Sequence, residues 1–212
     1  MFDQCRDQVD ISDDCPTQEI LNEAGNVPIY DSEGGSRPFR SLYSGELAIG
    51  DQQLLIFVRH FFCGACQAYL RAISKSITLR TYFTLAIPTS ITIIGLGSPE
   101  LIPSYRRITG TPFPIYADPS RRLYKALGMS WTLRAGPKCD YMKDINDYQW
   151  IKGQVDQVRQ EEKALRKKGG NLLWVGGEFL FAGGEVTWCK RMKTYRGHSE
   201  IQVIRRLLGA ED

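Results

Sequence analysis

Short apolar runs alternate with amphipathic segments between residues 54 and 129. The apolar runs 54–62, 90–98 and 113–119 have the length and composition of buried strands. Each is followed by a segment with helical spacing of its apolar residues. Strands that alternate with helices in this way form a sheet with parallel crossovers. We therefore expect an α/β fold in which a central mixed sheet is flanked by helices.

Flanking segments add hairpins and a closing helix. Residues 27–43 contain the turn sequence Asp-Ser-Glu-Gly-Gly, and residues 177–192 contain Ala-Gly-Gly between two β-rich pieces. Both patterns are typical of β-hairpins. A final helix is expected over 199–209. Ser120 and Ser199 are expected to be N-caps of the helices that follow them.

The domain organisation predicted from the sequence is one domain with two additions. Residues 1–28 are expected to form a loosely attached arm with a short helix at 15–25, and residues 29–212 to form the domain. Residues 131–170 interrupt the alternation and are read as a helical insertion lying on the core. Its thin apolar stripe consists of Ile151, Val155, Val158 and Leu165.

Composition argues against several kinds of partner. The formal net charge is +3, from 27 basic and 24 acidic residues spread along 212 positions, which is too weak a bias to indicate nucleic-acid binding. The N-terminus is polar and acidic, unlike a secretory signal, and the apolar segment 85–97 is too short to span a bilayer. We expect a cytoplasmic protein without nucleic-acid or membrane partners.

Cys63 and Cys66 are separated by two residues and lie where an apolar strand gives way to a helix. A structural zinc site needs four thiolate or imidazole ligands, and the sequence offers no second pair, so we expect no metal. A permanent disulfide across so short a loop would constrain the unfolded chain little. The remaining interpretation is redox chemistry through a reversible disulfide between the two cysteines.

The start of a helix favours a thiolate. Unsatisfied backbone N–H groups and the positive end of the helix dipole stabilise negative charge there. Arg59 and His60 lie just upstream and can add positive potential, although strand alternation lets only one of them face the site. We expect Cys63 to be nearer the junction and more exposed than Cys66, which favours Cys63 as the attacking thiolate.

The sequence resembles a known family in two blocks. The first block consists of FVRHFFCGACQAYLRAI and SITIIGLGSPELIPSYRRITGTPFPIYADPSRRLYKALGM. The second consists of GGEFLFAGGEVTWCKRM and HSEIQVIRRLLG. Both blocks are similar to peroxiredoxin-like proteins of the AhpC/TSA antioxidant type. The closer resemblance is to their thioredoxin-like branch with a Cys-x-x-Cys centre, in its fungal form. It implies a thioredoxin fold and thiol chemistry at Cys63 and Cys66.

The resemblance leaves the nucleophile open. Peroxiredoxins carry a Thr-x-x-Cys centre, in which the threonine position falls on Cys63 and the attacking cysteine on Cys66, whereas thioredoxins attack with the first cysteine. The Pro-x-x-x-Thr-x-x-Cys signature of peroxiredoxins is absent. Gly176 and Gly177 stand where thioredoxins place a cis-proline, and glycine there would leave the backbone open to a small ligand. With Phe62, they are our candidates for a substrate pocket.

Three functions remain open from the sequence. The first is a thiol-dependent oxidoreductase that acts on a peroxide or a small disulfide-like acceptor, without a cofactor. The second is a tailoring enzyme of secondary metabolism that acts on an organic small molecule. The third is a non-catalytic redox-sensing module. The expected partners are a small-molecule substrate and a thiol reductant, glutathione or thioredoxin, and a homodimer is compatible with the sequence.

Overall fold

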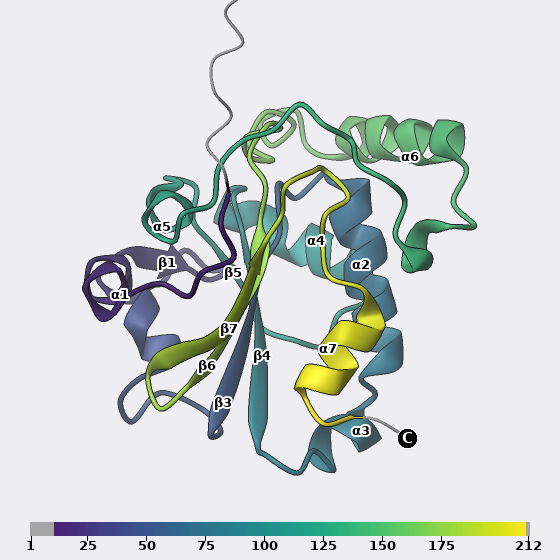
Figure 1. Ribbon diagram of the computed structural model, residues 1–212. Coiled ribbons are helices and arrows are strands. Elements are labelled where there is room, and N and C mark those ends of the chain that lie inside the picture. Colours follow the sequence, from purple (N-terminus) through teal and green to yellow (C-terminus); the bar gives the residue numbers. More distant parts are fainter. Residues whose placement is uncertain (1–10, 211–212) are drawn as a thin grey trace, which may run out of the picture.

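The structure is a computed structural model that describes residues 11–210, and the protein forms a mixed sheet of seven strands flanked by helices (Figure 1). The strands are β1 (Pro28–Tyr30), β2 (Ser36–Pro38), β3 (Gln52–Phe57), β4 (Thr89–Gly95), β5 (Ile115–Ala117), β6 (Gly177–Ala182) and β7 (Glu185–Arg191). The helices are α1 (Gln18–Gly25), α2 (Gly64–Ser76), α3 (Leu79–Phe83), α4 (Ile102–Thr109), α5 (Arg122–Ala126), α6 (Asp147–Gln160) and α7 (Ile201–Leu207).

The sheet order is β2-β1-β5-β4-β3-β6-β7. β3, β4 and β5 run parallel to one another, as the alternation of strands and helices predicts. β6 pairs with β3 and with β7 in antiparallel fashion, and β1 pairs likewise with β2 and β5. Both predicted hairpins, β1–β2 and β6–β7, are present. The expected α/β architecture with a mixed central sheet is confirmed.

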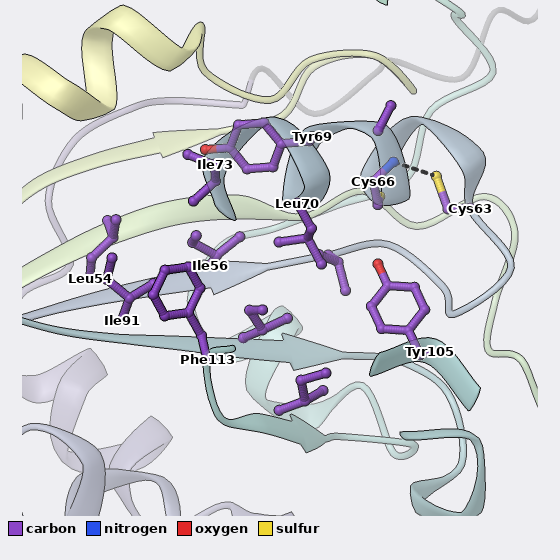
Figure 2. Close-up of a cluster of buried hydrophobic side chains, with 14 of the residues drawn as sticks. Leu54, Ile56, Cys63, Cys66, Tyr69, Leu70, Ile73, Ile91, Tyr105 and Phe113 are labelled. Carbon is purple, nitrogen blue, oxygen red and sulfur yellow. Dashed lines mark hydrogen bonds between the residues drawn. The ribbon is translucent and has the colours of Figure 1, made fainter. Parts of the chain in front are cut away.

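Two apolar clusters cover the two faces of the sheet. α2, α4 and α7 pack on one face, where the cluster includes both Cys63 and Cys66 (Figures 1 and 2). α1 and α5 pack on the other face, and Cys189 of β7 belongs to that second cluster. The two thiols of the Cys-x-x-Cys pair therefore lie on one side of the sheet and Cys189 on the other.

The central strand β3 is shorter than its apolar run suggests. The run extends to Phe62, but β3 ends at Phe57, where its pairing with β6 ends at Gly177, the first residue of β6. On the β4 side two backbone hydrogen bonds continue, from the Val58 N–H to the Ile94 carbonyl oxygen and from the Leu96 N–H to the Arg59 carbonyl oxygen. Residues 58–62 form a loop instead. This loop carries Arg59 and His60 to the start of α2.

Helix caps were only partly predicted. Gly110 ends α4 with a left-handed φ of 66°. At α5 the N-cap position is held by Arg121, while the Ser120 hydroxyl accepts a hydrogen bond from the Arg122 N–H at 3.2 Å. The predicted cap at Ser199 is wrong, because Glu200 occupies the N-cap of α7 and the Ser199 hydroxyl donates to buried Glu178 at 3.1 Å.

The N-terminal segment is packed where the structure describes it. Leu21 and Ala24 of α1 and the adjoining Val27 are buried in the second apolar cluster. The expectation of a loosely attached arm therefore does not hold for residues 18–28, and residues 1–10 lie outside the described part. Over residues 11–210, no helix is long and apolar enough to cross a membrane.

Candidate active site: the Cys63 and Cys66 thiols

The two cysteines lie at the junction between the loop after β3 and helix α2. Cys63 is the N-cap residue of α2, with φ −76° and ψ 106°, and Cys66 follows in the first turn. The Cys66 N–H donates a hydrogen bond to the Cys63 sulfur at 3.5 Å (Figure 2). A capping side chain accepts hydrogen bonds from the first helical turn, and a thiolate does so better than a thiol. The helix start therefore favours negative charge on Cys63.

Arg59, in the loop before α2, donates hydrogen bonds to both sulfurs. Its Nη1 atom donates to the Cys63 sulfur at 3.3 Å, and its backbone N–H donates to the Cys66 sulfur at 3.4 Å. The guanidinium is held in place by the carbonyl oxygens of Leu172 and Trp174 and lies over the Tyr195 ring, 4.1 Å from its centroid. A fixed cation is thus in direct contact with Cys63.

The surroundings move the two thiol pKa values in opposite directions. Burial by itself would raise the pKa of Cys63, but the hydrogen bond from the Cys66 thiol and the positive charge of Arg59 hold that pKa well below its ordinary value. Burial raises the pKa of Cys66 well above the ordinary value, and the adjacent Cys63 sulfur raises it further. The surroundings therefore favour negative charge on Cys63 over negative charge on Cys66.

His60 differs from Arg59 in its role. Its ring is buried, and burial is the main cause that lowers its pKa from 6.5 to about 4. Its Nδ1 atom has no hydrogen-bond partner among the described residues. His60 is neutral at physiological pH, so Arg59 is the cation beside Cys63. The expectation that strand alternation lets only one of the two face the site does not hold, because both residues lie in the loop after β3 and both act electrostatically on Cys63.

Helix α6 of the 131–170 insertion covers the start of α2 (Figure 1). Gln154 accepts a hydrogen bond from the Gly64 N–H at 3.2 Å, and Gln157 accepts one from the Gln67 side chain at 2.7 Å. Trp150 packs so closely on Gly64 that a Cβ atom there would lie 2.2 Å from the indole Nε1. Both sulfurs are fully buried beneath this layer, so the expectation of a more exposed Cys63 is wrong.

A cavity of about 740 Å³ opens beside the site. His60 and Phe62, from the loop that precedes Cys63, form part of its wall, so Phe62 lies where a substrate-pocket residue would be expected. α6 supplies another part of the wall. The other lining residues are Ile151, Gln154, Val155, Val158, Arg159, Arg166, Lys167, Gly169, Gly170 and Leu172. The apolar stripe predicted for the insertion thus faces this cavity through Ile151, Val155 and Val158.

Gly176 and Gly177 have a different role from the one expected. A Cβ atom on Gly176 would lie 1.7 Å from the carbonyl oxygen of Phe57, and one on Gly177 would lie 2.5 Å from that of Lys190. Glycine is therefore required for the close approach of neighbouring backbone, not to admit a ligand. Neither glycine lines the cavity beside His60.

Tyr105 of α4 is a residue of the site that sequence reasoning missed. Figure 2 shows its hydroxyl directed toward the end of α2 that carries the cysteines. The hydroxyl is buried and has no hydrogen-bond partner among the described residues. Burial, followed by the nearby Cys66 and Cys63 sulfurs, raises the pKa of Tyr105 well above its usual value. It therefore remains a proton-bearing donor beside the thiols, and no local sequence pattern marks it.

Metal-ligating side chains do not gather at the thiols. Over residues 11–210, no three histidine, cysteine, aspartate or glutamate side chains are placed to hold one ion. The second histidine, His198, is bound instead to Glu178 through its Nδ1 atom at 2.5 Å. What the site offers is two cysteine sulfurs, a fixed guanidinium and a buried imidazole.

Comparison with known proteins places the chain in a family. The family model described as AhpC/TSA antioxidant enzyme matches residues 79–194, more than half of the chain. The chain belongs to this family. The matched range begins after Cys63 and Cys66, so membership is carried by α3, β4, β5, the insertion and the closing hairpin.

Curated relatives agree with this membership. Peroxiredoxin-like 2C of Takifugu rubripes is 34% identical over 109 residues, which cover 51% of this chain and 46% of the relative. Peroxiredoxin-like 2C of Homo sapiens is 30% identical over 112 residues, which cover 53% and 46%. The matched stretch thus spans about half the length of the curated relatives.

Solved structures show the same fold. The bacterioferritin comigratory protein of Xanthomonas campestris superposes with a TM-score of 0.56 over 95% of this chain and 98% of its own, at 13% identity. Peroxiredoxin Q of the same organism gives a TM-score of 0.56 over 96% and 99%, also at 13% identity. The fold is that of peroxiredoxin-like, thioredoxin-fold proteins.

Proposed function

We propose that this member of the AhpC/TSA family is a thiol-dependent oxidoreductase that reduces a peroxide or a small disulfide-like acceptor, with Cys63 as nucleophile and Cys66 as resolving thiol. The observation that carries the proposal is the Arg59 guanidinium, 3.3 Å from the Cys63 sulfur. It stabilises a thiolate at the first cysteine while the second stays protonated, and thiolates rather than thiols are the nucleophiles.

With a hydroperoxide the chemistry proceeds in two steps. The Cys63 thiolate attacks one peroxide oxygen, the O–O bond breaks, and the alkoxide leaves and takes up a proton to give an alcohol. Cys63 is then a sulfenic acid. The Cys66 sulfur attacks this sulfenic sulfur, a disulfide forms, and the displaced hydroxide combines with the Cys66 proton as water. A thiol reductant, glutathione or thioredoxin, reduces the disulfide and completes the cycle.

Access to the sulfur requires α6 to move. Both sulfurs are fully buried, and the contacts of α6 with Gly64 and Gln67 hold it over the start of α2. Trp150 and Val158 of α6 also pack against the apolar cluster. Local opening of such a segment costs less free energy than global unfolding. We expect substrate entry to follow that opening.

The cavity beside His60 bears on the kind of acceptor. Its wall is mainly apolar, and the three charged residues that line it, Arg159, Arg166 and Lys167, are all cationic. Such a site suits an acceptor with an apolar body and a negative group. The same cavity is the observation that favours the second candidate, a tailoring enzyme acting on an organic small molecule.

Turnover tests the proposal. The purified chain is mixed with an organic hydroperoxide and either glutathione or thioredoxin, and peroxide loss is followed over many equivalents. We expect repeated turnover in the wild type and none in Cys63→Ser. In Cys66→Ser we expect a stable Cys63 sulfenic acid or mixed disulfide, because the resolving thiol is missing.

Cys139→Ser is the matched control, since Cys139 bonds to the carbonyl oxygens of Arg196 and His198 and the mechanism does not use it. It should turn over like the wild type. A single oxidation without turnover would support a redox sensor instead. Turnover that survives in Cys63→Ser and is lost in Cys66→Ser would reverse the roles of the two thiols.

A further inference from the structure

A second pair of cysteines lies on the opposite face of the sheet from Cys63 and Cys66. Cys189 is buried on β7, in the apolar cluster shared with α1 and α5. Its sulfur donates to the carbonyl oxygens of Asp13 at 3.1 Å and Asp14 at 3.4 Å. The next residue in the chain is Cys15, whose exposed side chain lies close enough to the Cys189 thiol to raise its pKa.

Arg191 fixes the segment that carries Cys15. Its backbone N–H donates to the Asp13 carboxylate at 2.8 Å, and its Nη1 atom donates to the carbonyl oxygens of Ser12 at 2.7 Å and Asp14 at 2.9 Å. The same Nη1 atom lies 3.5 Å from the Cys189 sulfur. Figure 1 shows this N-terminal segment running beside the strands of the β6–β7 hairpin before it enters α1. The two thiols are thus held together by a network of hydrogen bonds around them.

We propose that Cys15 and Cys189 form a second reversible disulfide, which ties the segment before α1 covalently to the edge strand β7. The sheet order places β7 at one end, where its free edge faces this segment. Because the pair lies across the sheet from Cys63 and Cys66, the proposal is independent of the function proposed above. The oxidant is a hydroperoxide.

Exposure sets the order of the steps. Cys15 is exposed and attacks the peroxide oxygen, giving a Cys15 sulfenic acid and an alcohol. The Cys189 sulfur then attacks the sulfenic sulfur, and hydroxide leaves with the Cys189 proton as water. Burial raises the pKa of Cys189 to about 12, which keeps it a thiol until the sulfenic acid has formed. The positive charge of Arg191 then favours loss of its proton during attack.

Peptide mapping by mass spectrometry tests this proposal on the full chain. The protein is treated with a small excess of hydrogen peroxide, remaining thiols are alkylated, and peptides are compared with and without reduction. We expect a linked Cys15–Cys189 peptide that disappears on reduction. The same link should form in the double variant Cys63→Ser, Cys66→Ser, which separates this pair from the proposed active site.

Three further variants sharpen the result. Cys15→Ser should lose the link, whereas Cys5→Ser and Cys139→Ser should keep it. Oxidation should also raise the melting temperature of the double variant, and this shift should be absent when Cys15→Ser is added. Free alkylation of Cys189 after oxidation, or a link from Cys189 to Cys5 or Cys139 in place of Cys15, would overturn the proposal.

Discussion

Replacing Arg59 with methionine removes the cation from the Cys63 thiolate while keeping a side chain of similar reach. The structure places Nη1 3.3 Å from the Cys63 sulfur. Over that distance the Coulomb energy of two unit charges is about 1.3 kcal/mol in bulk water and about 5 kcal/mol at an effective dielectric constant of roughly 20. A hydrogen bond to a charged group contributes about 1.5–3 kcal/mol net, which lies between these limits.

One pKa unit corresponds to about 1.36 kcal/mol. Loss of the Arg59 hydrogen bond should therefore raise the pKa of Cys63 by about 1–2 units. The pKa rises because a cation beside the sulfur stabilises the thiolate, so removal of the cation favours the thiol. At fixed neutral pH the fraction of thiolate, and with it the alkylation rate of Cys63, should fall.

The assay is the rate of Cys63 alkylation by iodoacetamide as a function of pH, with the modified peptide identified by mass. Arg59→Lys should lower the pKa of Cys63 less than Arg59 does. The lysine keeps the positive charge but lacks the planar guanidinium that contacts the sulfur. The control is Arg71→Met. Arg71 is an exposed cation on α2, and its Nε atom donates a hydrogen bond to the carbonyl oxygen of Ile108. An unchanged Cys63 pKa in folded Arg59→Met protein would refute the reasoning.

Two further predictions concern the cover and the pH dependence of stability. Gly64→Ala should push Trp150 away, because the new Cβ would lie 2.2 Å from the indole, and Cys63 should then be alkylated faster. The control is Gly153→Ala, whose new Cβ meets nothing within 4 Å and should not accelerate the alkylation of Cys63. Equal alkylation rates in the two variants would count against α6 as the cover of the thiols. The pKa of His60 is about 4 in the folded state, compared with 6.5 for an ordinary histidine, which is taken for the unfolded state. Between these two pH values the unfolded state binds more protons than the folded state. The free energy of unfolding should therefore fall by roughly 3 kcal/mol as the pH drops through this window. Urea titrations of His60→Asn should show a correspondingly flatter pH profile, and an unaltered profile would exclude His60 as the cause.

The elements around the thiols could be predicted because local and global signals agree there. The apolar run that starts at Leu54 is a buried central strand, and the change to helical spacing at Cys63 coincides with the N-cap of α2. Turn residues likewise located both hairpins. A thiolate-stabilising position for Cys63 follows from these local features alone, and the contact with Arg59 adds to it.

What could not be predicted depends on contacts between distant segments. β3 ends at Phe57, where its pairing with β6 ends, and no property of residues 58–62 reveals this. Ser199 has the residue type of an N-cap, but its hydroxyl donates a hydrogen bond to the buried Glu178 carboxylate instead. α6 docks on Gly64, the residue after Cys63, and a charged amphipathic helix carries no sign of where it will dock.

Tyr105 and Gly176 illustrate the same limit at the site. The Tyr105 hydroxyl is directed toward the start of α2 only because α4 packs on α2, and the pattern of its own helix predicts nothing beyond core packing. Gly176 stands at a position where an open backbone for a ligand was expected. The carbonyl of Phe57 fills that space instead, since the chain after Val175 runs directly against the end of β3.

The most direct test of the account is the pKa of the remaining thiol of the Cys63–Cys66 pair in Cys66→Ser and in Cys63→Ser, measured by pH-dependent alkylation of that residue in each purified variant. Cys63 in the first variant should titrate below the free-cysteine value of about 8.5, since Arg59 and the first turn of α2 remain in place. Cys66 in the second should titrate above that value because of its burial. A low pKa for Cys66 in Cys63→Ser, with an ordinary or raised pKa for Cys63 in Cys66→Ser, would contradict the assignment of Cys63 as the nucleophile.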